Sequence, residues 1–110
     1  MKCAILGYGK TSKVLAATLK ALGADVTVFA RKERDKADAF TKGYKFASFP
    51  SLKNTEYKFD ALINTVPQKV LGREEMKNIS SDCLFIEIAS APFGIDFQAA
   101  KEFAFDVIKA

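Results

Sequence analysis

Histidine and tryptophan are absent from this chain, and its 110 residues include only two cysteines and three prolines. Without histidine, and with Cys3 and Cys83 far apart in the sequence, the chain contains neither a zinc site nor a Cys–His catalytic pair. No apolar run approaches the length of about 20 residues that spans a membrane. No secretory signal is recognisable, because Met1 leads directly into a short apolar segment. These absences predict a cytoplasmic protein with buried, reduced thiols.

The excess of positive charge is small and scattered. The formal net charge is +4, and lysines alternate with acids, as in KERDKAD at residues 32–38. The ten phenylalanines and three tyrosines follow apolar patterns and do not accompany basic clusters. A nucleic-acid-binding surface is therefore not expected, and an anionic cofactor explains the excess more simply. The length fits one domain with a real core but is small for a complete enzyme.

The first 31 residues predict one nucleotide-binding βαβ unit. Residues 2–6 (KCAIL) are a short apolar strand, and the glycine-rich string GYGKTS follows at residues 7–12. A helix then ends at Gly23, and residues 25–29 (DVTVF) form a second strand. The apolar stripe of the helix consists of Val14, Leu15, Thr18, Leu19 and Leu22. This order of elements is the one that a dinucleotide-binding fingerprint requires.

Each position of the glycine-rich string has a physical role. Gly7 allows a sharp turn off the strand, and Gly9 lacks a Cβ, so the backbone can approach a pyrophosphate. Ser12 stands where the fingerprint has its third glycine and is still small enough for close packing of helix on strand. Free N–H groups of the first helical turn would hold the phosphates; a purely structural glycine turn is the alternative. The expected phosphate loop is Gly7, Tyr8, Gly9, Lys10, Thr11 and Ser12.

The end of the second strand indicates which dinucleotide is bound. Ala30, Arg31 and Lys32 stand where an acidic residue would receive the ribose of NAD. This exchange predicts a 2′-phosphate, and therefore NADP rather than NAD, with Arg31 and Lys32 as its ligands. The alternative is that these cations are solvated beside a charged helix, and Lys32 and Arg34 are closer to that alternative.

The rest of the chain alternates strands with helices, without repeats or a linker. Further strands are expected at residues 44–47, 60–64, 83–88 and 106–109, and further helices at 32–42, 71–78 and 96–105, with one helical turn within 48–53. Ala37 and Phe40 are expected on the inner face of the first of these helices, and Asp96 at the N-cap of the last. The continuous apolar run at 83–88 predicts a buried strand. The pattern predicts an α/β fold: a three-layered, doubly wound parallel sheet (Rossmann) with strand order 3-2-1-4-5-6.

In such a sheet the ligand lies over the carboxyl ends of the strands, where the order reverses between the first and fourth strands. The segments after the fourth and fifth strands are therefore expected at the nicotinamide end of the cofactor. The candidate residues are Thr65, Val66, Pro67, Ser90, Ala91 and Pro92. For the segment after the fourth strand, the alternative is that a proline simply ends the strand and the polar residues beside it have no role. For Ser90, the alternative is a loop serine that makes hydrogen bonds only to the backbone.

Glu87 lies within the fifth strand, where a buried carboxylate is costly without hydrogen-bond partners. We expect it to be hydrogen-bonded at the strand end rather than catalytic. The sequence assigns no general acid or base.

Several segments together resemble one known family. They are GYGKTS at 7–12, ALGADVTVFARK at 21–32, DALINTVP at 60–67 and IEIASAPFGIDF at 86–97. Along nearly its whole length, the chain resembles the C-terminal, nucleotide-binding domain of the A-type subunit in the dipicolinate synthase family. The most specific pieces are INTVP at 63–67 and the last segment, in which Glu87 stands where aspartate is commoner in the family.

The resemblance implies a sporulation-linked oxidoreductase of the lysine/diaminopimelate branch, which oxidises dihydrodipicolinate to dipicolinate and passes hydride to a nicotinamide cofactor. It also implies a flavoprotein-like second subunit. Family proteins have an N-terminal domain before this one and a Pro/Gly-rich segment after the sixth strand. We therefore expect residues 1–110 to be a single NADP-binding domain, a fragment of a longer two-domain protein that is not a competent enzyme alone. The sequence leaves open whether the chain forms a homo-oligomer.

Two other functions remain open. Shikimate dehydrogenases share a basic residue after the second strand and Asn-x-x-Pro after the fourth, but they lack the ending of the fifth strand found here. A regulatory nucleotide-sensing module would bind NAD or ATP without turnover, and such modules usually keep an acid where Arg31 stands. D-2-hydroxyacid dehydrogenase chemistry is excluded because it needs an arginine after the fifth strand, and no arginine follows Arg73.

Overall fold

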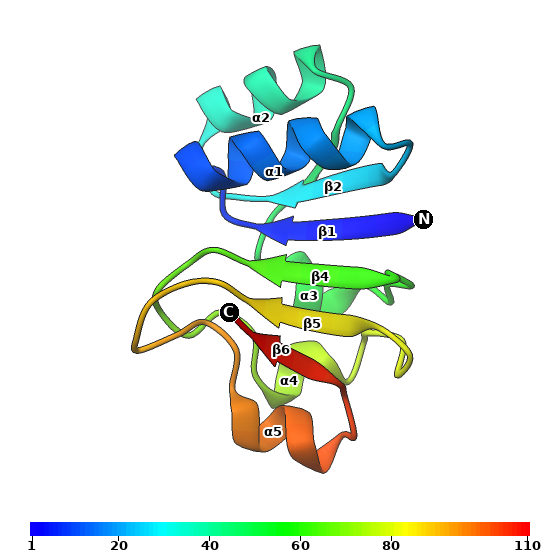
Figure 1. Cartoon of the computed structure of the whole chain (residues 1–110), viewed down its shortest axis with the longest axis vertical. Helices are drawn as coiled ribbons and strands as arrows, with labels where there is room; N and C mark the ends of the chain where they lie inside the picture. The colour runs from blue at the N-terminus through cyan, green and yellow to red at the C-terminus, as the bar shows by residue number, and fades with distance from the viewer.

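In a computed structural model that describes all 110 residues, six parallel strands form one sheet in the order β3-β2-β1-β4-β5-β6 (Figure 1). The strands are β1 (Lys2–Leu6), β2 (Asp25–Phe29), β3 (Lys45–Ala47), β4 (Ala61–Asn64), β5 (Leu84–Glu87) and β6 (Val107–Lys109). The predicted fold class and strand order are confirmed. The order reverses between β1 and β4, because right-handed crossovers first build the sheet in one direction and then in the other.

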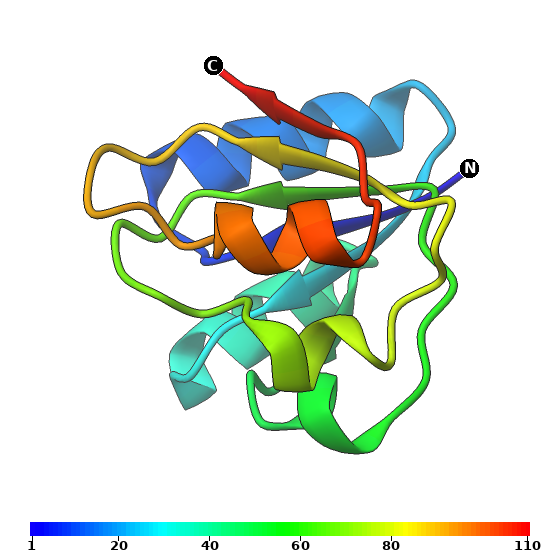
Figure 2. The same cartoon turned by 90° about the horizontal axis from the view of Figure 1, so that it is seen from below.

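The helices cover the two faces of the sheet unequally (Figure 2). On one face lie α1 (Lys10–Ala21) and α2 (Glu33–Thr41); on the other lie α3 (Ser51–Asn54), α4 (Arg73–Met76) and α5 (Phe97–Glu102). Asp96 caps α5 as predicted, since its carboxylate accepts a hydrogen bond from Ala99 N at 3.1 Å. No helix is both long and apolar enough to cross a membrane.

Successive residues of a strand point to opposite faces of the sheet, so the strands contribute side chains to two separate cores. Ala4 and Leu6 belong to a cluster of 15 buried residues beneath α3, α4 and α5, whereas Ile5 belongs to a cluster of 8 beneath α1 and α2. Cys3 and Cys83 are buried and form no disulfide. Burial raises the pKa of the Cys83 thiol to about 12, so this thiol stays protonated.

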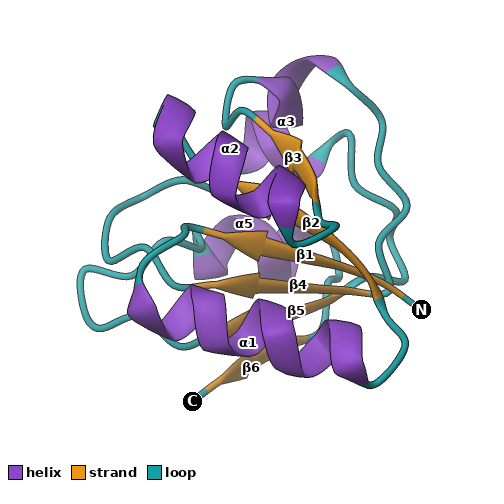
Figure 3. Ribbon diagram, turned by 90° about the horizontal axis from the view of Figure 1, so that it is seen from above, coloured by secondary structure: helices purple, strands orange, loops and turns teal.

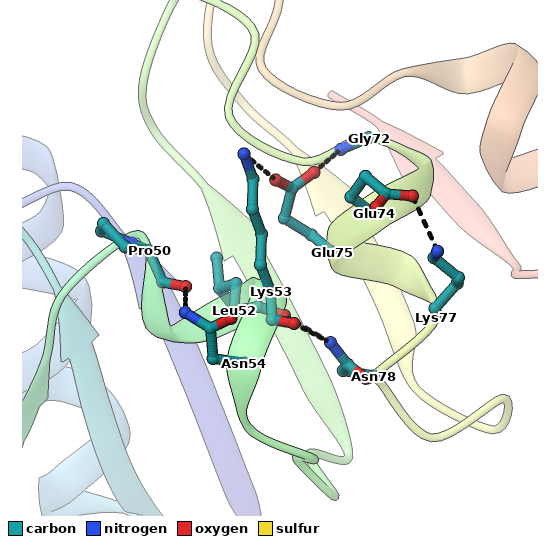
Figure 4. A network of polar contacts seen from close by, with 9 residues as sticks. All are labelled: Pro50, Leu52, Lys53, Asn54, Gly72, Glu74, Glu75, Lys77 and Asn78. Atoms are coloured by element: carbon teal, nitrogen blue, oxygen red, sulfur yellow. Dashed lines mark hydrogen bonds and ion pairs between the residues drawn. The ribbon is translucent and has the colours of Figure 1, made fainter.

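A polar network joins α3 to α4 (Figure 4). The side-chain amide of Asn78 donates to the carbonyl of Lys53 at 2.6 Å. Glu75 accepts a hydrogen bond from Gly72 N at 2.7 Å, and its carboxylate lies 3.9 Å from the ammonium of Lys53. The two helices are a single turn each and therefore depend on such contacts to stay in place.

The rotation of two helices differs from the prediction. In α2 the inward residue is Ala39, while Ala37 is exposed and Phe40 is 80% exposed. Val14 in α1 and Leu22 at its C-cap are exposed by 67% and 79%, and Thr18 is also exposed, although the expected apolar stripe included all three. The residues of α1 that face the sheet are Ser12, Leu15, Ala16 and Leu19. Small side chains let both helices approach the strands closely, and this packing, rather than hydrophobicity, set their rotation.

The strand at 83–88 is buried on one face only. Phe85 and Glu87 are fully buried towards α5, whereas Leu84 and Ile86, which point to the opposite face, are partly exposed. A continuous apolar run is typical of a strand covered on both faces. Here no helix of the chain covers the second face of β5.

Candidate nucleotide-binding site

The glycine loop leaves β1 at the point where the strand order reverses. Gly7 has φ +103°, a conformation that favours glycine, and its N–H donates to Phe29 O at 2.8 Å. A Cβ at this position would overlap the hydroxyl of Thr65. Gly9 is the N-cap of α1, and nothing lies within 4 Å of the place where its Cβ would be. The N-terminus of α1 thus faces open space and has no acidic residue in its first turn, as anion binding requires.

Two hydroxyl groups join the start of α1 to the end of β4. Thr65 Oγ1 donates to Leu6 O at 2.6 Å, and Ser12 Oγ lies 2.7 Å from the same Thr65 oxygen. Because the Thr65 proton is used towards Leu6, Ser12 donates to Thr65. This chain of hydrogen bonds fixes the glycine loop against the segment that follows β4.

Tyr8 joins the glycine loop to α2. Its hydroxyl donates to Asp38 Oδ2 at 2.6 Å, and Lys42 lies 3.0 Å from the same oxygen. The ammonium of Lys13 lies 5.3 Å from the centre of the Tyr8 ring. Burial, together with the acceptor carboxylate, raises the pKa of Tyr8, and the hydrogen bond from Tyr8 with the nearby Lys42 lowers the pKa of Asp38. Tyr8 is therefore a neutral donor at physiological pH.

Three cations lie between the end of β2 and the first turn of α2, and none of them makes an ion pair. We call Arg31, Lys32 and Arg34 the cation turn. All three side chains are exposed. The guanidinium of Arg31 lies 5.5 Å from the centre of the Phe49 ring, a cation–π contact that leaves its N–H groups available for a ligand.

The glycine loop and the cation turn line one cavity of about 610 Å³. Its expected lining residues are Gly7, Tyr8, Gly9, Arg31, Lys32 and Val66. An adjoining cavity of about 280 Å³ shares part of the glycine loop and adds Lys10, Thr11, Ser12, Thr65 and Pro67. The structure therefore brings together, in these two cavities, the expected residues that follow β1, β2 and β4. It does not bring Ser90, Ala91 and Pro92, which are exposed, into either cavity.

Glu87 is fully buried and anchors the segment that follows β5. One of its oxygens accepts from Gly94 N at 2.7 Å and Ile95 N at 3.0 Å, and the other accepts from Asn64 Nδ2 at 2.6 Å. A Cβ on Gly94 would overlap the amide of Asn64. The expected hydrogen bonding at the strand end is confirmed. Glu87 lines neither cavity, and its carboxylate fixes the segment that follows β5 to the end of β4.

Sequence reasoning missed some side chains that line the larger cavity. These are Lys13, Asp35, Asp38 and Phe49. The strand order places the end of β3 beside the end of β2, so a residue of the loop after β3 could have been expected there. Which side chain of that loop faces Arg31 depends on how the loop folds, and no periodic pattern shows it.

No family model matches the sequence. The A-type subunit of dipicolinate synthase from Bacillus subtilis (strain 168) is 33% identical over 99 residues, which are 90% of this chain and 33% of that protein. The crystal structure of the B. subtilis protein matches 99% of this chain with a TM-score of 0.92 and 31% identity, and 37% of that protein is covered. The corresponding dipicolinate synthase structure from Bacillus halodurans gives a TM-score of 0.92, 28% identity and coverage of 97% and 37%.

A more distant structure, CAD from Helicobacter pylori complexed with NADP(H), is 22% identical, with a TM-score of 0.74 and coverage of 99% of this chain and 33% of that one. This likeness shows a shared fold. The chain spans about a third of the length of the curated relative that it matches. The resemblance seen in the glycine loop and in the segments after β4 and β5 is thereby confirmed: the chain is similar to about a third of the A-type subunit of dipicolinate synthase.

Proposed function

We propose that these 110 residues bind NADP, as the cofactor domain of an oxidoreductase of the dipicolinate synthase kind. The observation that carries the proposal is the cation turn. Arg31, Lys32 and Arg34 lie beside the glycine loop without a carboxylate partner. An exposed group of cations on the rim of an anion-binding loop supports a ligand with an additional phosphate.

The two phosphate sites would have different physical origins. The pyrophosphate would lie at the N-terminus of α1, next to Gly9, where backbone N–H groups and the positive end of the helix dipole converge. The 2′-phosphate would lie at Arg31, whose planar guanidinium suits a bidentate contact with phosphate oxygens. Phe49 supports the guanidinium from the side of the β3 loop.

The carboxylates in the cavity are less suited to NAD. Asp38 is already engaged by Tyr8 and Lys42. Asp35 is the other carboxylate that lines the cavity, and it lies in α2 rather than at the end of β2, where a ribose-binding acid is expected. The end of β2 is followed by Ala30 and Arg31. This arrangement favours the 2′-phosphate over a free 2′-hydroxyl.

For the whole protein, we propose the reaction that the family resemblance implies: oxidation of dihydrodipicolinate to dipicolinate, together with a flavoprotein-like second subunit. When bound, the nicotinamide would accept the hydride. The H. pylori neighbour, whose structure contains NADP(H), supports a nicotinamide dinucleotide on this fold. The residues of this chain would bind and orient the cofactor: the glycine loop holds its phosphates, and Thr65, Val66 and Pro67 border the path towards the nicotinamide.

Calorimetric titration of the chain with NADPH and NADH in parallel tests the proposal. A charge-assisted bidentate contact contributes about 1.5–3 kcal/mol, which corresponds to a preference for NADPH of roughly ten- to hundredfold. Arg31→Ala should remove most of this preference. Arg73→Ala is the matched control, because Arg73 is exposed, pairs with Glu102 and lies outside the cavity. Equal affinities for the two cofactors in the unmodified chain would contradict the proposal.

The second candidate is a nucleotide-sensing module without turnover. The observation in its favour is Asp35, a carboxylate in the cavity that makes no ion pair and could receive a ribose hydroxyl. In that case NADH or ATP would bind at least as tightly as NADPH. Asp35→Asn would then weaken binding more than Arg31→Ala, the reverse of the order expected for NADP.

A further inference from the structure

A row of isoleucines crosses the sheet on the face that carries α1. Ile5 pairs with Ile63, Ile63 with Ile86, and Ile86 with Ile108, in the register of β1, β4, β5 and β6. Paired residues of parallel strands point to the same side, so all four side chains project towards the α1 face. Ile5 is fully buried and Ile63 is 7% exposed, but Ile86 is partly exposed and Ile108 is 51% exposed. The row passes from beneath α1 into solvent.

The two flanks of α1 differ in character. Lys13 and Lys20 lie on the flank next to α2, since Lys13 contacts the Tyr8 ring and the ammonium of Lys20 lies 3.1 Å from where a Cβ of Gly43 would be. Helical periodicity places Val14, Thr18 and Leu22 away from these lysines, on the side of the open strands. No charged residue is among these three, and Val14 and Leu22 are among the most exposed apolar side chains of the molecule.

The uncharged flank of α1 and the open end of the isoleucine row meet in a corner. We define the α1–β6 corner by Val14, Thr18, Leu22, Ile86 and Ile108. Figure 3 shows α2 on one side of α1 and β6 on the other. Among the large apolar side chains that are exposed, Val14, Leu22 and Ile108 border this corner. Exposed apolar side chains on both sides of an uncovered sheet face are typical of an interaction site.

We propose that a second copy of this chain fills the α1–β6 corner, with the two α1 helices antiparallel about a two-fold axis. Neighbouring strands lie about 4.8 Å apart and packed helices about 8–10 Å apart. Since α1 packs on β1 and β2, a helix beside it lies about two strands further along the sheet, against Ile86. The helix required there must be apolar on one flank and uncharged, and α1 of a second copy has such a flank. Each copy then covers the open strands of the other in an isologous interface.

The charges of α1 fit this antiparallel arrangement. Val14, Thr18 and Leu22 bring no charge into the contact. Lys10, the first residue of α1, would lie at the carboxyl end of the partner's α1, where the helix dipole is negative. The larger cavity lies on the other flank, beside Lys13 and α2, so the inferred dimer does not depend on the proposed cofactor.

Sedimentation velocity of the full chain over a series of concentrations tests the proposal. We expect a species of twice the monomer mass of 12.1 kDa. Val14→Lys should convert it to the monomer, and this exposed helical position tolerates lysine without loss of fold. Ile108→Lys should do the same, while Phe40→Lys, at an exposed apolar residue of α2 outside the corner, should leave the dimer intact. Far-UV circular dichroism of each variant verifies folding.

A monomer at every concentration would overturn the proposal and leave the corner for a segment of another protein or of a longer chain. A dimer that survives Val14→Lys in the folded state would also overturn it, because the contact would then lie elsewhere. Loss of the dimer in Phe40→Lys would place the interface on α2 instead.

Discussion

The hydroxyl of Tyr8 donates a 2.6 Å hydrogen bond to the carboxylate of Asp38, and this bond joins the glycine loop to α2. Tyr8 lies between the two glycines of the loop, and Asp38 lies on the helix that follows the cation turn. The contact therefore fixes the distance between the two places where phosphate groups are expected. It is made by residues 30 positions apart in the sequence.

Acidification should weaken the fold through Asp38. The hydrogen bond from Tyr8 and the pairing with Lys42 lower the pKa of Asp38 below its usual value of 3.8. A carboxylate with a lower pKa in the folded state adds stability that is present above its unfolded pKa and is lost as the pH falls through the folded value. Glu74, whose pKa Lys77 lowers, adds to the loss. We expect the free energy of unfolding, measured in urea, to fall below about pH 5.

The substitution Asp38→Asn should flatten this acid dependence, because the residue can no longer lose a charge. Asp106→Asn is the matched control, at an exposed aspartate that makes no ion pair. An identical pH profile for the Asp38→Asn variant and the unmodified chain would show that the Tyr8 contact contributes nothing to stability.

Glu87→Gln should destabilise the chain by about 1–3 kcal/mol, the cost of leaving a buried donor unsatisfied. Both carboxylate oxygens of Glu87 accept hydrogen bonds, so the amide of glutamine would place an N–H₂ group against Gly94 N or Asn64 Nδ2. Urea unfolding measures the difference. Glu56→Gln, at an exposed glutamate that makes no ion pair, should change the free energy of unfolding by less than about 0.5 kcal/mol. Equal effects of the two substitutions would contradict the anchoring role of Glu87.

Substitutions at two glycines should affect stability and nucleotide binding separately. Gly94→Ala should lower the free energy of unfolding, since its Cβ would overlap Asn64 in the buried interior. Gly9→Ala should leave stability nearly unchanged, because its backbone is extended and the space around it is open, but it should weaken NADPH binding by intruding on the pyrophosphate. Chemical unfolding and calorimetry of both variants give the comparison. Unchanged NADPH affinity in Gly9→Ala would place the pyrophosphate elsewhere.

Thr65→Val should cost about 1–3 kcal/mol, because the Ser12 hydroxyl, which is 1% exposed, loses its acceptor. Leu6 O keeps the backbone hydrogen bond from Thr65 N at 3.0 Å, so the loss concerns mainly Ser12. The double variant Ser12→Ala/Thr65→Val should be less destabilised than the sum of the two single variants. Additive losses would show that the two hydroxyls do not interact.

The strand order, the glycine loop and the position of the cation turn could all be predicted from the order of residues along the chain. These features depend on local causes: apolar strand runs, glycines where the backbone turns sharply, and the residue type at the end of one strand. The parallel order then follows because right-handed crossovers leave few other topologies. For the same reason the residues after β1, β2 and β4 were expected to meet at one edge of the sheet, and they line adjoining cavities there.

The contacts that support this site depend instead on the packing of distant elements. Tyr8 with Asp38, Arg31 with Phe49, and Glu87 with Asn64 each join residues from different elements, so they follow from how a helix is rotated or a loop is folded. The pattern of apolar residues did not predict the rotation of α1 and α2 about their axes. Small residues face the sheet because they allow close approach, while larger apolar residues such as Val14 and Phe40 face solvent. The face at Ile86 and Ile108 is open because no helix of this chain covers β5 and β6 on the side of α1. The apolar pattern of β5 alone does not predict this open face.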